Sequence, residues 1–260
     1  MKKNNLNFLK NFLGLENKKI IITGCSGQLG ASLTDNFLKL GCTVIGLDMK
    51  RPKKINNKNY FFYKLDISNS KENTFIFNEI YKKFKNIDCL INNAGVAVFE
   101  PFTNRSDDDL DWVTSVNLKS YFYSIKNFYK FSDKKSSKSI INISSIYSII
   151  SPDPKIYSKN DRKSSEIYGA TKAGVNQMTR YFAIHLTDKN IRVNTVSPGG
   201  IFNTTSPQSK LFVKKYSLRN PLNRMAKTEE IVGAVVYLAS SSSTYTNGHN
   251  LIVDGGMSSW

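Results

Sequence analysis

Tyr168 and Lys172 stand four residues apart in the stretch YGATK, a spacing that puts two side chains on one face of a helix, one turn apart. A free phenol has a pKa near 10, about three units above neutral pH. A nearby ammonium favours the phenolate, and lowering the phenol pKa to about 7 takes on the order of 4 kcal/mol of such stabilisation. The pair therefore predicts a proton-transfer centre in which Tyr168 exchanges a proton with a substrate oxygen.

A serine at the end of a neighbouring predicted strand could hold that substrate oxygen. ISS at 143–145 offers Ser145 for this role, with Ser144 as the alternative. Tyr123 does not compete with Tyr168, because in YSIKN the lysine follows after three residues, not four. Tyr and Lys at this spacing occur on many helices, so surrounding elements must support the assignment.

The stretch TGCSGQLG at 23–30 follows an isoleucine-rich strand pattern and precedes a helical one, with glycines at 24, 27 and 30. Such glycines let the backbone turn tightly, approach a pyrophosphate and bring helix and strand close together. The helix N-terminus would add free N–H groups and the positive end of its dipole. An ordinary glycine-rich turn is the alternative for this stretch taken alone.

Asp48 lies 18 residues beyond Gly30, close to the spacing at which an acid binds the adenosine ribose hydroxyls of a dinucleotide. Its carboxylate would repel a 2′-phosphate, so NAD is favoured over NADP. Lys50 and Arg51 weaken that preference, because either could reach a phosphate.

Strand and helix patterns alternate along the whole chain. Predicted strands cover 19–23, 43–48, 60–66, 87–92, 139–145, 192–197 and 250–254, and predicted helices cover 28–40, 70–85, 107–129, 166–187 and 228–240. The strands are rich in Ile and Val without polar alternation, which indicates burial on both faces. We therefore expect an α/β fold with a doubly wound, Rossmann-like parallel sheet, forming a single domain at 19–260 after an N-terminal extension at 1–18.

Polar and small residues follow six of these strands, where ligands bind in such sheets. They are the glycine stretch, Asp48, Asp66, Asn93-Ala94-Gly95, Ser144-Ser145 and Pro198-Gly199-Gly200. Six strand ends of this kind predict a long ligand lying across the edge of the sheet.

Composition narrows the classes of function. The 260 residues carry 37 Lys and Arg against 20 Asp and Glu, a net charge of +17, but the lysines are scattered and form no basic stripe. We therefore expect a basic surface and no nucleic-acid partner. No apolar run is long enough to span a membrane. In the extension, Leu6, Leu9, Phe12 and Leu13 could line a short helix, which we expect to pack on the domain or on a neighbouring subunit rather than on a membrane.

The three cysteines, Cys25, Cys42 and Cys89, are an odd number and have no metal-ligand spacing. We expect no metal site and a reducing cytoplasmic location.

The order of these motifs, together with Asn117 in SVNL, SPGG at 197–200 and the ending NGHNLIVDGG, resembles the short-chain dehydrogenase/reductase family from about residue 16 to residue 260. The resemblance implies an NAD(P)-dependent oxidoreductase that transfers hydride between nicotinamide and an alcohol or carbonyl group. It implies the catalytic residues Asn117, Ser145, Tyr168 and Lys172. It implies, with our own reading of the glycine stretch, the cofactor contacts Gly24, Ser26, Gly27, Gln28, Leu29, Gly30, Asp48, Asp66, Ile67, Asn93, Ala94, Gly95, Tyr168, Lys172, Pro198, Gly199 and Ile201.

Some roles come from the resemblance alone. It implies that Lys172 holds the nicotinamide ribose, that Asn117 supports a water chain to Lys172, and that the chain forms a homodimer or homotetramer. Where the family often has threonine two residues after Ile201, this chain has Asn203. The glycine spacing also departs from the commoner TGxxxGxG pattern, because position 28 is Gln28. We expect this side chain beside the phosphates or the nicotinamide ribose.

The substrate is less well defined. The 146–167 segment between Ser145 and Tyr168 is longer than the family usually has and contains Lys155, Lys159, Arg162 and Lys163. We expect it to form a pocket wall for a bulky, anionic substrate, with a surface extension of no role in the site as the alternative. Its sequence resembles a subgroup associated with flagellin modification and surface-sugar biosynthesis, which implies a sugar or sugar-nucleotide substrate. The 201–225 loop is expected to close over the substrate. A 3-oxoacyl-thioester reductase of fatty-acid type is the first alternative. A non-catalytic cofactor-sensing or nucleic-acid-binding protein that reuses the fold is the second.

Overall fold

The computed structural model describes residues 2–52, 55–158 and 163–260. Lys159 and Arg162, which we expected in the wall of the substrate pocket, lie outside these described residues.

A seven-stranded sheet runs through the centre of the protein, and all of its pairings are parallel. Its order is β3-β2-β1-β4-β5-β6-β7, so the chain starts in the middle and winds outward in both directions. The strands are β1 (Lys19–Thr23), β2 (Thr43–Asp48), β3 (Tyr60–Lys64), β4 (Cys89–Asn92), β5 (Lys138–Ile143), β6 (Ile191–Pro198) and β7 (Asn250–Val253). The predicted doubly wound Rossmann-like fold is confirmed.

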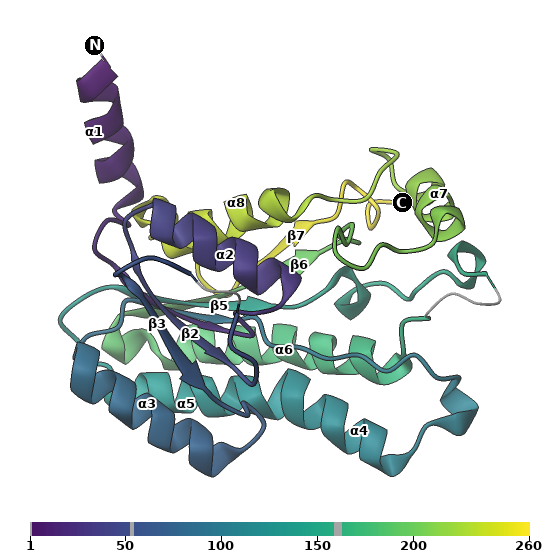
Figure 1. The fold of residues 1–260 in the computed structure, drawn as a ribbon, viewed down its shortest axis with the longest axis horizontal. Coiled ribbons are helices and arrows are strands. Elements are labelled where there is room, and N and C mark those ends of the chain that lie inside the picture. Colours follow the sequence, from purple (N-terminus) through teal and green to yellow (C-terminus); the bar gives the residue numbers. More distant parts are fainter. Residues whose placement is uncertain (1, 53–54, 159–162) are drawn as a thin grey trace.

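Helices cover both faces of the sheet, with α2 and α8 on one face and α3, α5 and α6 on the other (Figure 1). The helices are α1 (Lys2–Leu13), α2 (Gln28–Lys39), α3 (Ser70–Phe84), α4 (Asp107–Thr114), α5 (Ser120–Phe131), α6 (Glu166–His185), α7 (Lys210–Arg219) and α8 (Thr228–Ala239). No helix in the described part of the chain is both long and apolar enough to cross a membrane.

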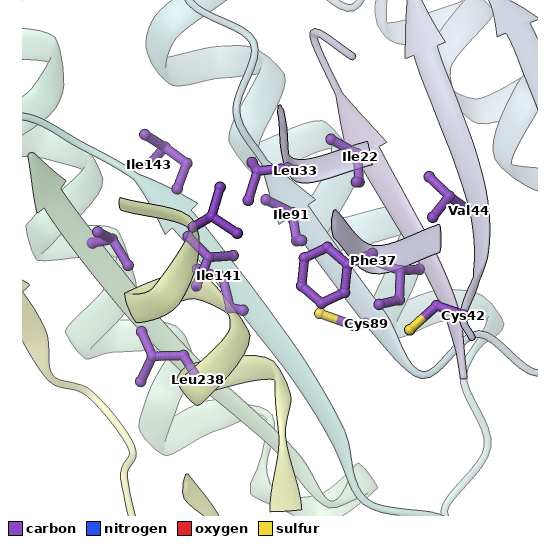
Figure 2. Close-up of a cluster of buried hydrophobic side chains, with 14 of the residues drawn as sticks. Ile22, Leu33, Phe37, Cys42, Val44, Cys89, Ile91, Ile141, Ile143 and Leu238 are labelled. Atoms are coloured by element: carbon purple, nitrogen blue, oxygen red, sulfur yellow. The ribbon is translucent and has the colours of Figure 1, made fainter. Parts of the chain in front are cut away.

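Alternate strand residues serve two separate cores. Ile20 and Ile22 of β1 belong to the cluster beneath α2 and α8, part of which Figure 2 shows, whereas Ile21 belongs to the cluster beneath α3, α5 and α6. Both faces are therefore apolar, which explains the runs of Ile and Val without polar alternation.

Two differences from the predicted elements matter for the site. The helix predicted over 107–129 is interrupted by a π-helical turn, Ser115–Lys119, which contains Asn117. The 201–225 loop contains the helix α7, whose sequence KLFVKKYSLR lacks regular apolar spacing and buries only Tyr216. The other elements end within two residues of their predicted limits.

The N-terminal extension forms α1, which stands away from the body of the molecule (Figure 1). Leu13 packs on the core at the base of this helix, but Phe8, Leu9 and Phe12 are exposed. The expected packing on this domain is thus limited to the end of the helix.

Candidate functional site

A cavity of about 780 Å³ opens at the carboxyl ends of the strands. It brings together residues from the segment after β4, from β5, β6 and α6, which are far apart in the sequence. The predicted site residues in its wall are Leu29, Asn93, Gly95, Ser145, Tyr168, Lys172, Pro198, Gly199 and Ile201.

Tyr168 and Ser145 meet in this cavity. Tyr168 lies in the first turn of α6, which Ser165 caps by accepting a hydrogen bond from the Tyr168 backbone N–H. Burial raises the pKa of Tyr168, whereas its hydrogen bond with Ser145 lowers it. Burial is the larger effect, so the pKa of the phenol is raised overall. Bringing it down toward neutral pH requires a positive charge close to the phenol.

Lys172 supplies an amine one turn along the same helix. Its Nζ lies 5.7 Å from the centre of the Tyr168 ring and donates a hydrogen bond to the Ile143 carbonyl at 2.8 Å. Only 3% of its surface is exposed, and burial lowers the pKa of Lys172 to about 7. A lysine that titrates near neutral pH is typical of functional sites.

Ser144, the alternative to Ser145, also lines the cavity, but its hydroxyl proton is engaged elsewhere. Its hydroxyl donates a hydrogen bond to the Lys172 carbonyl at 2.9 Å and so fastens the end of β5 to α6. Because this donor is already used, the geometry favours Ser145 for holding a substrate oxygen.

Asn117 is fully buried behind the cavity and is not part of its wall. Its Oδ1 accepts from the Val96 N–H at 2.8 Å, and its Nδ2 donates to the Val96 carbonyl at 2.9 Å. The π-helical turn places this amide against the segment that follows β4, and such turns often occur at functional sites. A Cβ built on Gly95 would lie 3.5 Å from Lys172 Nζ and 3.6 Å from Asn117 Oδ1, so Gly95 sits between the two side chains.

Comparison with known proteins decides the family. The family model described as "Enoyl-(Acyl carrier protein) reductase" matches residues 26–258. A 3-oxoacyl-[acyl-carrier-protein] reductase FabG from Buchnera aphidicola is 33% identical, over 94% of this chain and 99% of that protein. The chain belongs to the short-chain dehydrogenase/reductase family. It is therefore an NAD(P)-binding oxidoreductase acting on CH–OH and C=O groups.

Two further relatives bear on the details. A short-chain dehydrogenase from Leptospira borgpetersenii, solved with bound NAD+, superposes with a TM-score of 0.89 at 36% identity, covering 96% of this chain and 95% of that one. Post-translational flagellin modification protein A from Campylobacter coli is 28% identical, over 93% of this chain and 98% of that protein.

The glycine turn of this short-chain dehydrogenase fits a dinucleotide phosphate. Gly24 has φ +65°, and a Cβ on Gly30 would lie 2.0 Å from the Gly24 carbonyl oxygen, so both positions require glycine. Gly27 is different: it is exposed, and its Cβ would meet only one atom, at 3.5 Å. That open side, at the start of α2, is where a phosphate could approach.

The N-terminus of α2 is also free of side-chain capping. The helices α3 and α6 have capping hydrogen bonds from Asn69 and Ser165, whereas Gly27 offers no side chain to α2. The first N–H groups of α2 thus remain available to an anion.

Asn93 and Asp48 hold this turn in place. Asn93 donates from Nδ2 to the carbonyls of Thr23 and Gly24, both at 3.0 Å. The Asp48 carboxylate accepts from the backbone N–H groups of Ser26 and Lys50, both at 3.0 Å. The acid at the end of β2 is therefore fixed beside the glycine turn.

Four other predicted cofactor residues lie along the same edge of the sheet. Ala94 packs so closely on Gly24 that a Cβ there would be 2.8 Å from the Ala94 Cα. Asp66 accepts hydrogen bonds from the Ser68 N–H and hydroxyl, and Ile67 packs beside the core. The Gln28 side chain donates to the Phe202 carbonyl at 2.7 Å. Its expected contact with phosphate or ribose stays a prediction, and the side-chain amide is already hydrogen-bonded.

The sequence did not indicate the aromatic wall of the cavity. Tyr147 and Tyr157 lie in the 146–167 segment, and their hydroxyls are 3.4 Å apart. Phe212 of α7 packs on the Tyr157 ring at 5.6 Å and on the Tyr216 ring at 5.9 Å. Nothing in the spacing of these residues marks them as partners, because they come together only when the segment meets α7.

Polar contacts join the same two elements. Arg219 of α7 forms an ion pair with Asp153 at 3.0 Å, and Lys215 donates to the Tyr157 carbonyl at 3.2 Å. The long segment after Ser145 and the helix α7 thus form one continuous wall of the cavity.

Proposed function

We propose that this short-chain dehydrogenase is an NAD-dependent enzyme that oxidises an alcohol or reduces a carbonyl of a sugar derivative. The observation that carries the proposal is the meeting of Ser145, Tyr168 and the buried Lys172 in one cavity beside the glycine turn. Asn117, which is buried behind the cavity wall, is the fourth residue of the proposed catalytic set.

Each residue has a distinct part in the proposed mechanism. Ser145 hydrogen-bonds the substrate oxygen and holds it next to the Tyr168 hydroxyl. Tyr168 takes the hydroxyl proton during oxidation and returns it to the forming alkoxide during reduction. Lys172 in its charged form favours the phenolate and holds the nicotinamide ribose. The bound nicotinamide supplies or accepts the hydride.

The preference for NAD rests on Asp48. Both of its oxygens face backbone N–H groups at the end of β2, so its negative charge stays where an adenosine ribose would lie. A 2′-phosphate there would be repelled. Arg51 does not offset this charge directly, because its guanidinium lies over the Phe62 ring, 5.8 Å from the centre.

A sugar-type substrate is supported by the Campylobacter coli flagellin modification relative and by the size of the aromatic-walled cavity. The alternative, reduction of a 3-oxoacyl thioester, is favoured by the Buchnera aphidicola reductase at 33% identity. A panel of nucleotide sugars, sugar phosphates and acyl thioesters, followed by NADH absorbance, separates the two. Salt-sensitive nucleic-acid binding without turnover on any member of the panel would favour the non-catalytic alternative instead.

The decisive test is Tyr168→Phe. We expect turnover to fall by about 10²- to 10⁴-fold, the range for a lost acid–base group, while NADH binding is retained. Tyr245→Phe, at a fully exposed tyrosine, is the matched control. Turnover in Y168F equal to that of the control would exclude the mechanism.

We also propose that the protein is a homodimer or homotetramer in the cytoplasm. Phe122 of α5 and Tyr181 and Ile184 of α6 are exposed, and Phe122 and Tyr181 both pack on the ring of Phe182. Such a patch is typical of a protein–protein interface. Light scattering of the wild type and of Ile184→Asp tests the oligomer.

The free, buried thiols of Cys25, Cys42 and Cys89 suit a reducing compartment.

A further inference from the structure

A second phenol, in addition to that of Tyr168, lies against Lys172. Tyr121 of α5 is 1% exposed, and Lys172 Nζ donates a hydrogen bond to its hydroxyl at 3.3 Å. The same Nζ is 5.3 Å from the centre of the Tyr121 ring. Tyr121 is thus in direct contact with the amine on which the proposed proton transfer depends.

The direction of this hydrogen bond follows from the other bond that Tyr121 makes. A phenol has one proton to donate, and that of Tyr121 goes to the Ile143 carbonyl at 2.9 Å. The phenol oxygen can therefore only accept from Lys172. Since the Ile143 carbonyl also accepts from Lys172, two acceptors favour the charged amine.

We propose that Tyr121 is a positioning residue that keeps Lys172 protonated and aims its remaining N–H toward the cofactor side of the cavity. This inference rests on the proposed function, in which the charge of Lys172 assists Tyr168. Tyr121 itself is not among the residues that line the cavity in the described structure.

Apart from Tyr121, the described side chains around Lys172 Nζ offer no group that would keep the amine charged. The titratable groups facing Nζ in the described structure are the phenols of Tyr121 from α5 and Tyr168 from α6. The segment after β4 contributes Gly95, and the π-helical turn contributes the neutral amide of Asn117. Among these described residues no carboxylate balances the buried charge, which is consistent with a lowered pKa whose only cause is burial.

The test is Tyr121→Phe, which removes one oxygen from a buried ring. Tyr123→Phe on the same helix is the matched control, and the melting temperature of both variants checks that they fold. Loss of a hydrogen bond to a charged group should lower kcat/KM at pH 8 by about 10- to 100-fold. NADH binding, followed by fluorescence across about pH 5 to 9, should weaken with rising pH about one to two units earlier than in the wild type.

A double-mutant cycle separates positioning from packing. If Tyr121 acts through Lys172, adding Y121F to K172M leaves NADH binding unchanged, whereas a packing role gives the same loss in both backgrounds. An unshifted pH dependence of NADH binding in Y121F would overturn the proposal. If no substrate in the panel is turned over, the proposed function fails, and the NADH-binding measurements still decide the role of Tyr121.

Discussion

Replacing Lys172 with methionine tests whether burying the charged amine destabilises the folded protein as the structure implies. Burial lowers the pKa of Lys172 from 10.5 to about 7, a difference of about 3.5 pH units. At 1.36 kcal/mol per unit, keeping this group charged costs the cofactor-free fold about 5 kcal/mol. The cost is absent above pH 10.5, where the group is neutral in both states, and is fully present below about pH 7.

The stability of the wild type should therefore rise with pH through this window, because the unfolded chain binds more protons than the folded one. Between pH 7 and pH 9 the contribution of Lys172 amounts to about 2 kcal/mol. Methionine fills a similar volume and carries no charge. The advantage in stability of K172M over the wild type should thus shrink by about 2 kcal/mol from pH 7 to pH 9.

Urea unfolding of the cofactor-free proteins at several pH values measures this difference directly. Lys126→Met, an exposed position on α5, is the matched control and should give a stability difference that does not change with pH. A K172M difference that stays constant within about 0.5 kcal/mol over the same range, against the 2 kcal/mol expected from linkage, would refute the reasoning. In that case the pKa of Lys172 stays near that of a free lysine, because water or the surrounding acceptors offset the cost of burying its charge.

Four further predictions concern the cofactor site and the cavity wall. Gly30→Ala places a methyl group 2.0 Å from the Gly24 carbonyl oxygen and should destabilise the fold by about 1–3 kcal/mol or more, measured by urea unfolding. Gly27→Ala has room for its methyl group, so its stability should be unchanged while NADH titration shows weaker binding. Asp48→Ser should raise the affinity for NADP relative to NAD by about tenfold or more, and equal ratios in the two proteins would contradict the assignment. Arg219→Ala removes a half-exposed ion pair, so it should change the melting temperature little but raise the KM for substrate.

The sheet and its ligand-binding edge could be predicted from the sequence because they depend on local signals. Runs such as Ile20–Ile22 are apolar at every position, which a strand buried on both faces requires. Parallel pairing then forces all the strand ends to one edge, so Gly24 and Ser145 come together without any contact being known in advance. The sequence order of the motifs and the rule for parallel sheets are sufficient for this part of the site.

The aromatic wall and Tyr121 could not be found in the same way. Tyr216 sits in a helix whose apolar residues show no regular spacing, and its burial depends on the narrow space that Gly199 and Gly200 leave for its ring. In the sequence, Tyr121 is one of several aromatic residues in a helical stretch, and nothing distinguishes it from the residues that fill the core. Its contact with Lys172 depends on how α5 packs across the end of β5, which no periodicity encodes.

The glycine turn shows what the unusual spacing of TGCSGQLG changes. With glycine at 27 rather than 28, the position at the start of α2 carries a side chain, and Gln28 uses it to reach the Phe202 carbonyl and the Thr228 hydroxyl at 2.7 and 3.1 Å. These partners lie in the loop after β6 and at the first residue of α8. A glycine at position 28 could make neither bond. The amide therefore ties the predicted phosphate-binding turn to the loop that leads into α7, so that the element expected to hold the cofactor also fixes one border of the substrate cavity.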